Sequence, residues 1–176
     1  MIGFLRFIGV VNAAIWFGSA IFFTIVAGPA FFSDEMERLI RPPYNGAAAQ
    51  VLLKRYFYLH YWCGGIAVIH LLLERLYTGR SFERFTSVLL AAILGFSLLG
   101  GFWLQPRLKE LHYIKYSAAT AEERAEADKS FGAWHGVSQT MNLFVTAGLL
   151  FYLWRVTSLN HPARVPGFRK LSVGWK

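Results

Sequence analysis

The chain has 176 residues, which suits a single domain, and its composition is 55% hydrophobic, 17% aromatic and only 16% charged, against about 25% charged residues in soluble domains. Together with a mean hydropathy of +0.39, this composition excludes an ordinary soluble domain and indicates an integral membrane protein. The formal net charge of +8 does not indicate nucleic-acid binding, because the basic residues lie at expected helix ends and in the tail, where they suit anionic lipid headgroups.

Four long runs of the sequence contain no Asp, Glu, Lys or Arg, namely residues 7–33, 56–73, 85–106 and 130–154. A helix needs about 20 apolar residues to cross a bilayer, and a charge at its centre costs roughly 2.5–3.5 kcal/mol on insertion scales. The runs therefore predict an all-α fold, an integral membrane four-helix bundle. We expect its helices to cover about 8–32, 47–77, 82–105 and 130–157.

The 1–2 and 3–4 connections are each predicted to hold a short interfacial helix. In the first, Ser33 precedes an acidic stretch and suits an N-cap. In the second, Pro106 is expected to end the third spanning helix. The pattern Thr120-x-x-Glu123 then predicts a capped, solvated helix within residues 107–129.

Residues 1–160 are thus predicted to form one transmembrane domain, followed by a basic irregular tail over 161–176. Four spans place both termini on one side of the membrane. Lys and Arg number nine on each side, whereas the acidic residues leave a net charge of +7 on the terminal side and +1 on the loop side. Only the acidic residues break the tie, and the more positive terminal side is the one expected in the cytoplasm.

The fourth helix carries a stripe of polar residues at i, i+3, i+4 and i+7, and these residues share one helical face: His135, Ser138, Gln139 and Asn142. Such a stripe in lipid faces the bundle interior. One interpretation is hydrogen bonding between helices, at about 0.6 kcal/mol per bond. The other is a binding site for a ligand, a metal or a cofactor.

Histidines on neighbouring helices favour the second interpretation. The second and fourth helices both start on the loop side, so His60 and His135 are expected at a similar depth. Two histidines on facing helices suit a haem b group or a transition metal. The further candidates for metal ligation are Cys63, His70 and His112. His70 alternatively hydrogen-bonds Asn142, Asn12 or Ser97, and Arg107 is placed to meet a phosphate or another anion.

Several motifs, taken in chain order, resemble the transmembrane protein 205-like family. They are Trp16-x-Gly18, Gly28-Pro29-x-x-Phe32, Tyr56-Phe57, Trp103-Leu104-x-Pro106-Arg107 and Phe131-x-x-x-His135-Gly136-x-Ser138-x-x-x-Asn142-Leu143. The resemblance implies a four-helix membrane domain of unknown biochemical function, and it points toward export or metal handling. It also implies that Trp103, Pro106, Arg107, His135, Ser138 and Asn142 carry the family pattern.

These observations lead to one main hypothesis and two alternatives. The main hypothesis is a small membrane protein whose interior polar site binds haem, a metal or a small ligand through His60, His135, Ser138, Asn142 and Arg107. The first alternative is a non-catalytic accessory subunit or interaction protein that contacts other membrane subunits as well as the lipid bilayer. The second is an exporter of metal or drug-like cations. No set of catalytic residues is visible in the sequence, so an enzyme is not favoured.

Overall fold

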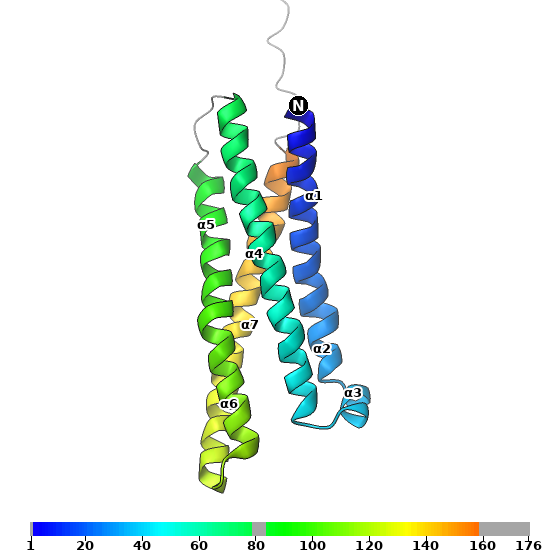
Figure 1. Ribbon diagram of the computed structural model, residues 1–176, viewed down its shortest axis with the longest axis vertical. Coiled ribbons are helices and arrows are strands. Elements are labelled where there is room, and N and C mark those ends of the chain that lie inside the picture. The colour runs from blue at the N-terminus through cyan, green and yellow to red at the C-terminus, as the bar shows by residue number, and fades with distance from the viewer. Residues whose placement is uncertain (1, 79–83, 159–176) are drawn as a thin grey trace, which may run out of the picture.

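The computed structural model describes residues 2–78 and 84–158, and Figure 1 shows them as a bundle of long helices. The predicted tail over 161–176 lies outside the described residues. The first half of the chain contains α1 (Ile2–Ile21), the π-helical η1 (Phe22–Ala27), α2 (Gly28–Phe31), α3 (Asp34–Leu39) and α4 (Tyr44–Thr78). The second half contains α5 (Arg84–Leu99), the π-helical η2 (Gly100–Leu104), α6 (Gln105–Ser117) and α7 (Ala121–Ser158).

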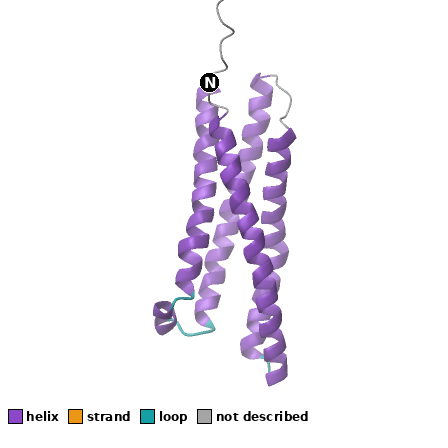
Figure 2. Ribbon diagram, turned by 180° about the vertical axis from the view of Figure 1, so that it is seen from behind, coloured by secondary structure: helices purple, strands orange, loops and turns teal. Residues whose placement is uncertain are grey.

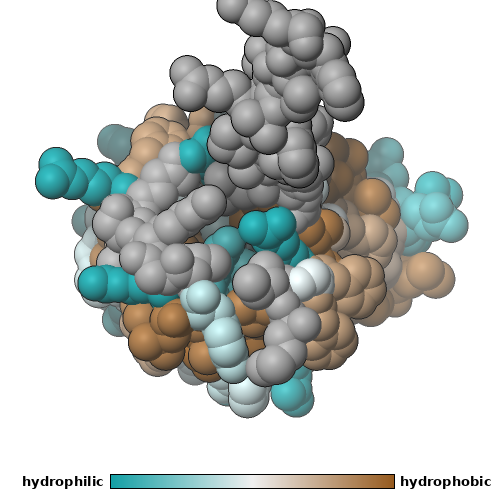
Figure 3. All heavy atoms as spheres, turned by 90° about the horizontal axis from the view of Figure 1, so that it is seen from above, coloured by the Kyte–Doolittle hydropathy of each residue, from teal (hydrophilic) through white to brown (hydrophobic). Residues whose placement is uncertain are grey.

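Four helices are long and apolar enough to cross a membrane, and they are Gly3–Phe31, Tyr44–Tyr77, Arg84–Ser117 and Ala121–Ser158. This confirms the predictions of an all-α fold and of a multi-pass membrane protein. In a view along the bundle, apolar side chains reach its outer edge (Figure 3), as expected of a surface that faces lipid.

Each spanning helix packs against two neighbours. α1 packs against α4 and α7, and α5 packs against the same two helices. Seen from behind, the α3 connection and the α6–α7 turn lie at the end opposite the N-terminus (Figure 2). We call this end the loop end. The buried core between the helices combines large side chains, among them Trp16, Leu149 and Tyr152, with small ones, namely Ala13, Ala20, Cys63 and Ala67.

The expected end of the third spanning helix at Pro106 was wrong, because the chain stays helical through this proline to Ser117. The π-helical turn of η2 directly precedes Pro106, which occupies one of the first two positions of α6. Proline lacks a backbone N–H, and a widened π turn tolerates the missing hydrogen bond. The first helix has the same construction, with η1 preceding Pro29.

The two connections at the loop end differ from one another. In the first, the Ser33 hydroxyl accepts a hydrogen bond from the Met36 N–H at 3.3 Å and caps the short helix α3, as expected. In the second, the described residues form no separate short helix. Instead α6 continues the third spanning helix, and α7 begins at Ala121, with the Thr120 hydroxyl accepting from the Glu123 N–H at 3.2 Å. Whether either connection lies in the membrane interface stays a prediction.

Candidate functional site

The centre of the bundle contains a buried polar cluster contributed by three helices. The Trp16 indole N–H of α1 donates to Nδ1 of His60 in α4 at 3.0 Å. The Ser97 hydroxyl of α5 lies 3.4 Å from the same nitrogen and donates to the Ile93 carbonyl at 2.8 Å. The side chains are sealed from the surroundings, since Trp16, His60 and Ser97 are 0%, 1% and 2% exposed.

These contacts define where the proton of the His60 ring lies. An indole N–H can only donate, so Nδ1 of His60 must accept. A neutral imidazole with an accepting Nδ1 carries its proton on Nε2. His60 Nε2 is buried and has no hydrogen-bond partner among the described residues. The cluster therefore holds an N–H group in the apolar interior without an acceptor.

A second set of hydrogen bonds connects the surroundings of His60 to the bundle surface. The Tyr56 ring lies 4.2 Å from the His60 ring, centroid to centroid. The Tyr56 hydroxyl donates to Oδ1 of Asn142 at 3.1 Å, and Asn142 Nδ2 donates to the Thr24 hydroxyl at 2.6 Å. Thr24 donates in turn to the Ala20 carbonyl at 2.7 Å and is exposed on η1. Together with the cluster, this chain links all four spanning helices.

The polar stripe of α7 is divided between the interior and the surface. Asn142 joins the interior chain, whereas His135 and Ser138 are only partly buried and Gln139 is exposed. Nε2 of His135 lies 3.2 Å from the Gln139 side chain of its own helix, and its ring stacks on Phe131 with centroids 5.7 Å apart. Within the described part of the chain, Asn142 alone among the four is hydrogen-bonded to another spanning helix.

The expectation that His60 and His135 lie at a similar depth was wrong. Tyr56 bonds Asn142 and so sets the register of α4 against α7. His60 follows Tyr56 by one turn, whereas His135 precedes Asn142 by two turns. At a rise of 1.5 Å per residue the two histidines are about 16 Å apart along the bundle. The structure does not bring them together.

Two further candidate residues lie at the loop end, away from the cluster. Arg107 is exposed, and its guanidinium forms an ion pair with Glu110 at 2.9 Å on the same helix. The His112 ring packs against Gly46, where an added Cβ would overlap its Nε2. Neither side chain contacts His60 in any described interaction.

Cys63 and His70 lie deeper in the bundle, but neither has the predicted partners. Cys63 is 3% exposed and belongs to the apolar core, and its carbonyl accepts from Asn12 Nδ2 at 2.9 Å. Because Asn12, Asn142 and Ser97 all bond elsewhere, the hydrogen bonds expected for His70 are not formed. Nε2 of His70 has no hydrogen-bond partner among the residues that the structure describes, and a Cβ placed on Gly9 would lie 2.5 Å from it.

The sequence did not reveal that Trp16, Tyr56 and Ser97 surround His60, or that Thr24 is linked to Tyr56 through Asn142. Trp16 was overlooked because a tryptophan in an apolar run normally signals packing. A spacing signal was available, since Tyr56 and His60 are four residues apart and share a helical face. Thr24 and Ser97 were visible as single polar residues within uncharged runs, but nothing in the sequence paired them.

The chemistry of the cluster is that of a hydrogen-bond donor. The described residues contain no group of three or more His, Cys, Asp and Glu side chains that could hold a metal ion. A histidine that binds a metal uses an unprotonated nitrogen and donates its other ring N–H to an acceptor. His60 has the reverse arrangement, because Nδ1 accepts from Trp16.

Comparison with known proteins adds a family but no activity. Residues 11–117, more than half of the chain, match the domain of unknown function DUF4149. This match places the chain in a family of domains whose function is unknown. The protein belongs to the DUF4149 family. No curated protein and no solved structure matches it.

Proposed function

We propose that this DUF4149 protein binds a small, uncharged molecule inside its helix bundle, through a hydrogen bond from Nε2–H of His60 to an acceptor on that molecule. The observation that carries the proposal is the buried Nε2 without a partner. A buried donor left unpaired costs about 1–3 kcal/mol, and most such groups in proteins have a partner. A carbonyl or ether oxygen of a membrane-soluble molecule supplies the missing acceptor.

The chain of side chains from Tyr56 to Thr24 supports a ligand that arrives from the membrane. Asn142 and Thr24 lie between α7 and the first helix, and their hydrogen bond is exposed at the bundle surface. Tyr56 connects this surface to the ring of His60. A polar molecule entering from lipid therefore meets hydrogen-bonding groups before it reaches Nε2.

Haem and transition metals fit this site less well than a neutral ligand. Coordination needs the lone pair of Nε2, which is available only if the ring loses its proton or Trp16 stops donating to Nδ1. The spacing of His60 and His135, about 16 Å by helical rise, also argues against one iron held by both. We accordingly propose His60 and Asn142 as site residues, with Ser138 one turn before Asn142 on α7, and assign His135 and Arg107 no ligand.

The finer family resemblance, to transmembrane protein 205-like proteins, is compatible with this proposal. That resemblance would make the bound molecule either a transported cargo or a signalling molecule that is dissolved in the membrane. Neither the accessory-subunit nor the exporter alternative has an observation of its own among the described residues, and the accessory subunit becomes an outcome of the following experiment.

The test compares wild-type protein with His60→Phe, His60→Gln and His135→Gln, each isolated in nanodiscs formed directly from native membranes. Small molecules are extracted with organic solvent and quantified by mass spectrometry, alongside absorption spectra and elemental analysis. We expect one species near one per wild-type chain, absent from His60→Phe and partly retained in His60→Gln, because the glutamine amide can still donate. His135→Gln is the matched control and keeps the species.

Three results would contradict the proposal. Identical small-molecule content in wild type and His60→Phe would show that His60 holds no ligand. A Soret band or a stoichiometric transition metal that disappears in His60→Phe restores the haem or metal hypothesis. A protein that co-purifies stoichiometrically with all variants, with no small molecule present, favours the accessory subunit.

A further inference from the structure

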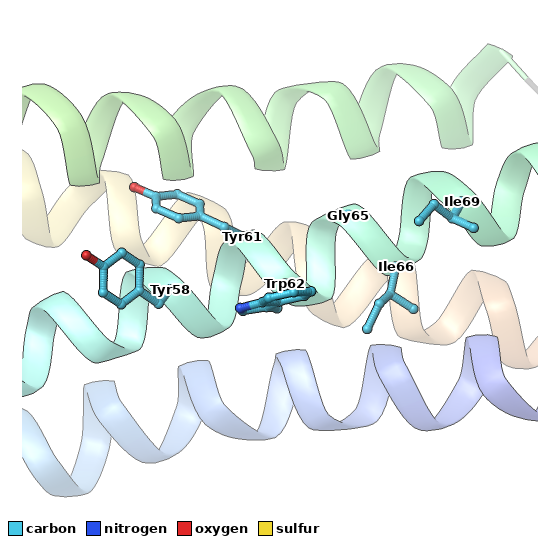
Figure 4. A pocket seen from close by; sticks show the side chains of 6 residues that line it. All are labelled: Tyr58, Tyr61, Trp62, Gly65, Ile66 and Ile69. Carbon is cyan, nitrogen blue, oxygen red and sulfur yellow. The ribbon is translucent and has the colours of Figure 1, made fainter.

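A shallow hollow lies on the outer face of α4, separate from the interior cluster (Figure 4). Its volume is about 430 Å³, and it is lined by Tyr58, Tyr61, Trp62, Gly65, Ile66 and Ile69. All of these residues belong to α4. Gly65 adds no side chain to the hollow, and a Cβ placed there would meet no atom within 4 Å. The side chains on either side of Gly65 therefore rise above a gap in the helix surface.

Aromatic rings form the wall of the hollow nearest the loop end. The ring of Tyr61 stacks on Phe102 of η2 with centroids 5.4 Å apart, which fixes its orientation. Trp62 is 74% exposed and projects from the helix into the surrounding lipid. Beyond Gly65 the lining is aliphatic. This order, aromatic near the membrane surface and aliphatic toward the centre, follows the polarity of a lipid from its headgroup to its tail.

Two cations stand at the loop end of the hollow. The Lys54 ammonium lies 5.9 Å from the centre of the Tyr58 ring. Arg55 precedes Tyr58 by three residues and Trp62 by seven, so it occupies the same helical face. In the described part of the chain, neither cation forms an ion pair with a carboxylate. The next charged residue of α4 after Arg55 is Glu74, so both cations mark the edge of the uncharged run.

We propose that this hollow binds one phospholipid with an anionic headgroup, independently of the function proposed for His60. The phosphate contacts Lys54 and Arg55, and one acyl chain lies along the helix from Tyr58 to Ile69. These two residues are 11 positions apart, or about 16 Å at 1.5 Å per residue. That distance is about half of the roughly 30 Å hydrocarbon core, the depth of one leaflet. The hollow thus has the length of a lipid tail and the charge of a headgroup site.

The test is native mass spectrometry of detergent-purified protein, titrated separately with dioleoyl phosphatidylglycerol and dioleoyl phosphatidylcholine. Wild type is expected to retain the anionic lipid in preference to the zwitterionic one. Each cation near an anionic headgroup contributes about fivefold to affinity. The double variant Lys54→Gln/Arg55→Gln should therefore lose about tenfold or more for phosphatidylglycerol and approach the affinity for phosphatidylcholine.

Gly65→Leu fills the hollow and is expected to weaken binding of both lipids. Its matched control is Gly95→Leu on α5, where an added Cβ also meets open space but the residue does not line the hollow. The control for charge is Lys109→Gln/Lys129→Gln, which removes two exposed loop-end cations outside α4. Both controls should keep the wild-type lipid preference.

Four results would overturn the proposal. Equal retention of the two lipids by wild type would show that there is no site for an anionic headgroup. If the Lys109/Lys129 variant lost as much affinity for phosphatidylglycerol as the Lys54/Arg55 variant, the preference would come from general surface charge. Unchanged binding by Gly65→Leu removes the acyl groove. A two-chain species without bound lipid, dissociated by Gly65→Leu and not by Gly95→Leu, would make a second copy of this protein the occupant. Circular dichroism and gel filtration of each variant verify that it is folded.

Discussion

At the scale of single residues, Trp16 decides what His60 can do. By donating to Nδ1 it holds the imidazole neutral, with the proton on the far nitrogen and directed away from the indole. The same ring would be a metal ligand if an acceptor replaced the indole N–H, because Nε2 would then be unprotonated. A side chain that looks like ordinary core packing therefore selects the chemistry of its neighbour.

Asn142 and Gln139 share the polar stripe of α7, but they should differ in their contribution to stability. Asn142 bonds Tyr56 and Thr24 on two other helices, whereas Gln139 contacts only His135 on its own helix. Interhelical hydrogen bonds in membranes contribute about 0.6 kcal/mol each on average. We expect Asn142→Leu to lower the free energy of unfolding by about 1 kcal/mol and Gln139→Leu to leave it unchanged. Reversible unfolding in mixed micelles measures the free energy of unfolding of both variants. Equal effects would contradict the assignment of Asn142 to the interior and Gln139 to the surface.

The unpaired Nε2 of His70 has a different environment from that of His60, because α1 approaches it closely. A Cβ on Gly9 would lie 2.5 Å from that nitrogen, and the ring is only 7% exposed and so cannot turn outward. We expect Gly9→Ala to destabilise the protein by roughly 1–3 kcal/mol, as overpacked cores do. The melting temperature in detergent measures the change.

Gly18→Ala, also on α1, is the control for Gly9→Ala, since its added Cβ meets nothing within 4 Å. Because alanine loses less backbone entropy than glycine on folding, Gly18→Ala should leave the stability of the protein unchanged or raise it by up to about 1 kcal/mol. Equal melting temperatures for the two variants would show that α1 and α4 are not in tight contact at this level.

At the scale of elements, the π-helical turns allow prolines inside the first and third spans. Each proline follows a widened turn, so the helix continues on the far side instead of ending. In the third span this extends the helix into the hairpin of α6 and α7, where Lys115 pairs with Asp128. The aromatic ring of Phe131 closes the same hairpin against His112, with centroids 6.0 Å apart.

Amide hydrogen exchange tests the continuation of the helix beyond Pro106. The backbone of residues 107–117 is hydrogen-bonded in α6, whose carboxyl end is marked by the Ala118 N–H bonding the Ile114 carbonyl at 3.0 Å. We expect this segment to exchange more slowly than the connection over 118–120. Equally rapid exchange from 107 onward would mean that the helix ends at the proline after all.

The elements also show which features the sequence could reveal. The spans were predictable because lipid excludes charge, so each uncharged run reports one crossing. The relative depth of residues on two helices was not predictable, because it depends on how far each helix extends beyond the membrane. α7 begins at Ala121, nine residues before its uncharged run, and Phe131 and His135 belong to the hairpin level, below Tyr56 and Asn142. Counting from the start of each run therefore misplaced His135 relative to His60.

At the scale of the whole molecule, the four spans bring the start of α1 and the end of α7 to the same end of the bundle (Figure 1). The more positive net charge at this end, +7 against +1 at the loop end, favours a cytoplasmic location. We expect fluorescent-protein fusions at the N-terminus and after Ser158 to be fluorescent in the cytoplasm, and alkaline phosphatase inserted between α2 and α3 to be active outside it. Opposite locations for the two termini would contradict four crossings, and two external termini would reverse the orientation.

The whole molecule also explains why the site is a cluster and not a motif. Its members come from α1, η1, α4, α5 and α7, and neighbouring members are separated by up to 118 positions in the sequence. Polar residues in uncharged runs were visible from the sequence, and hydrogen bonding between helices was one of the two interpretations of the stripe that contains Asn142. Their partners depend on the packing of the helices, which spacing along one helix cannot define.

The most direct test of the proposed His60 tautomer is the ¹⁵N NMR spectrum of its ring nitrogens. The protein is labelled with ¹⁵N-histidine in nanodiscs, and the His60 signals are assigned with His60→Gln. We predict a neutral ring with its proton on Nε2 and an unprotonated Nδ1 whose ¹⁵N signal is shifted by the Trp16 hydrogen bond. Trp16→Phe should remove that shift and free the ring to take the other tautomer. A proton on Nδ1 of wild type, or a Nε2 signal displaced by a bound metal, would contradict the account and return His60 to the metal and haem hypothesis.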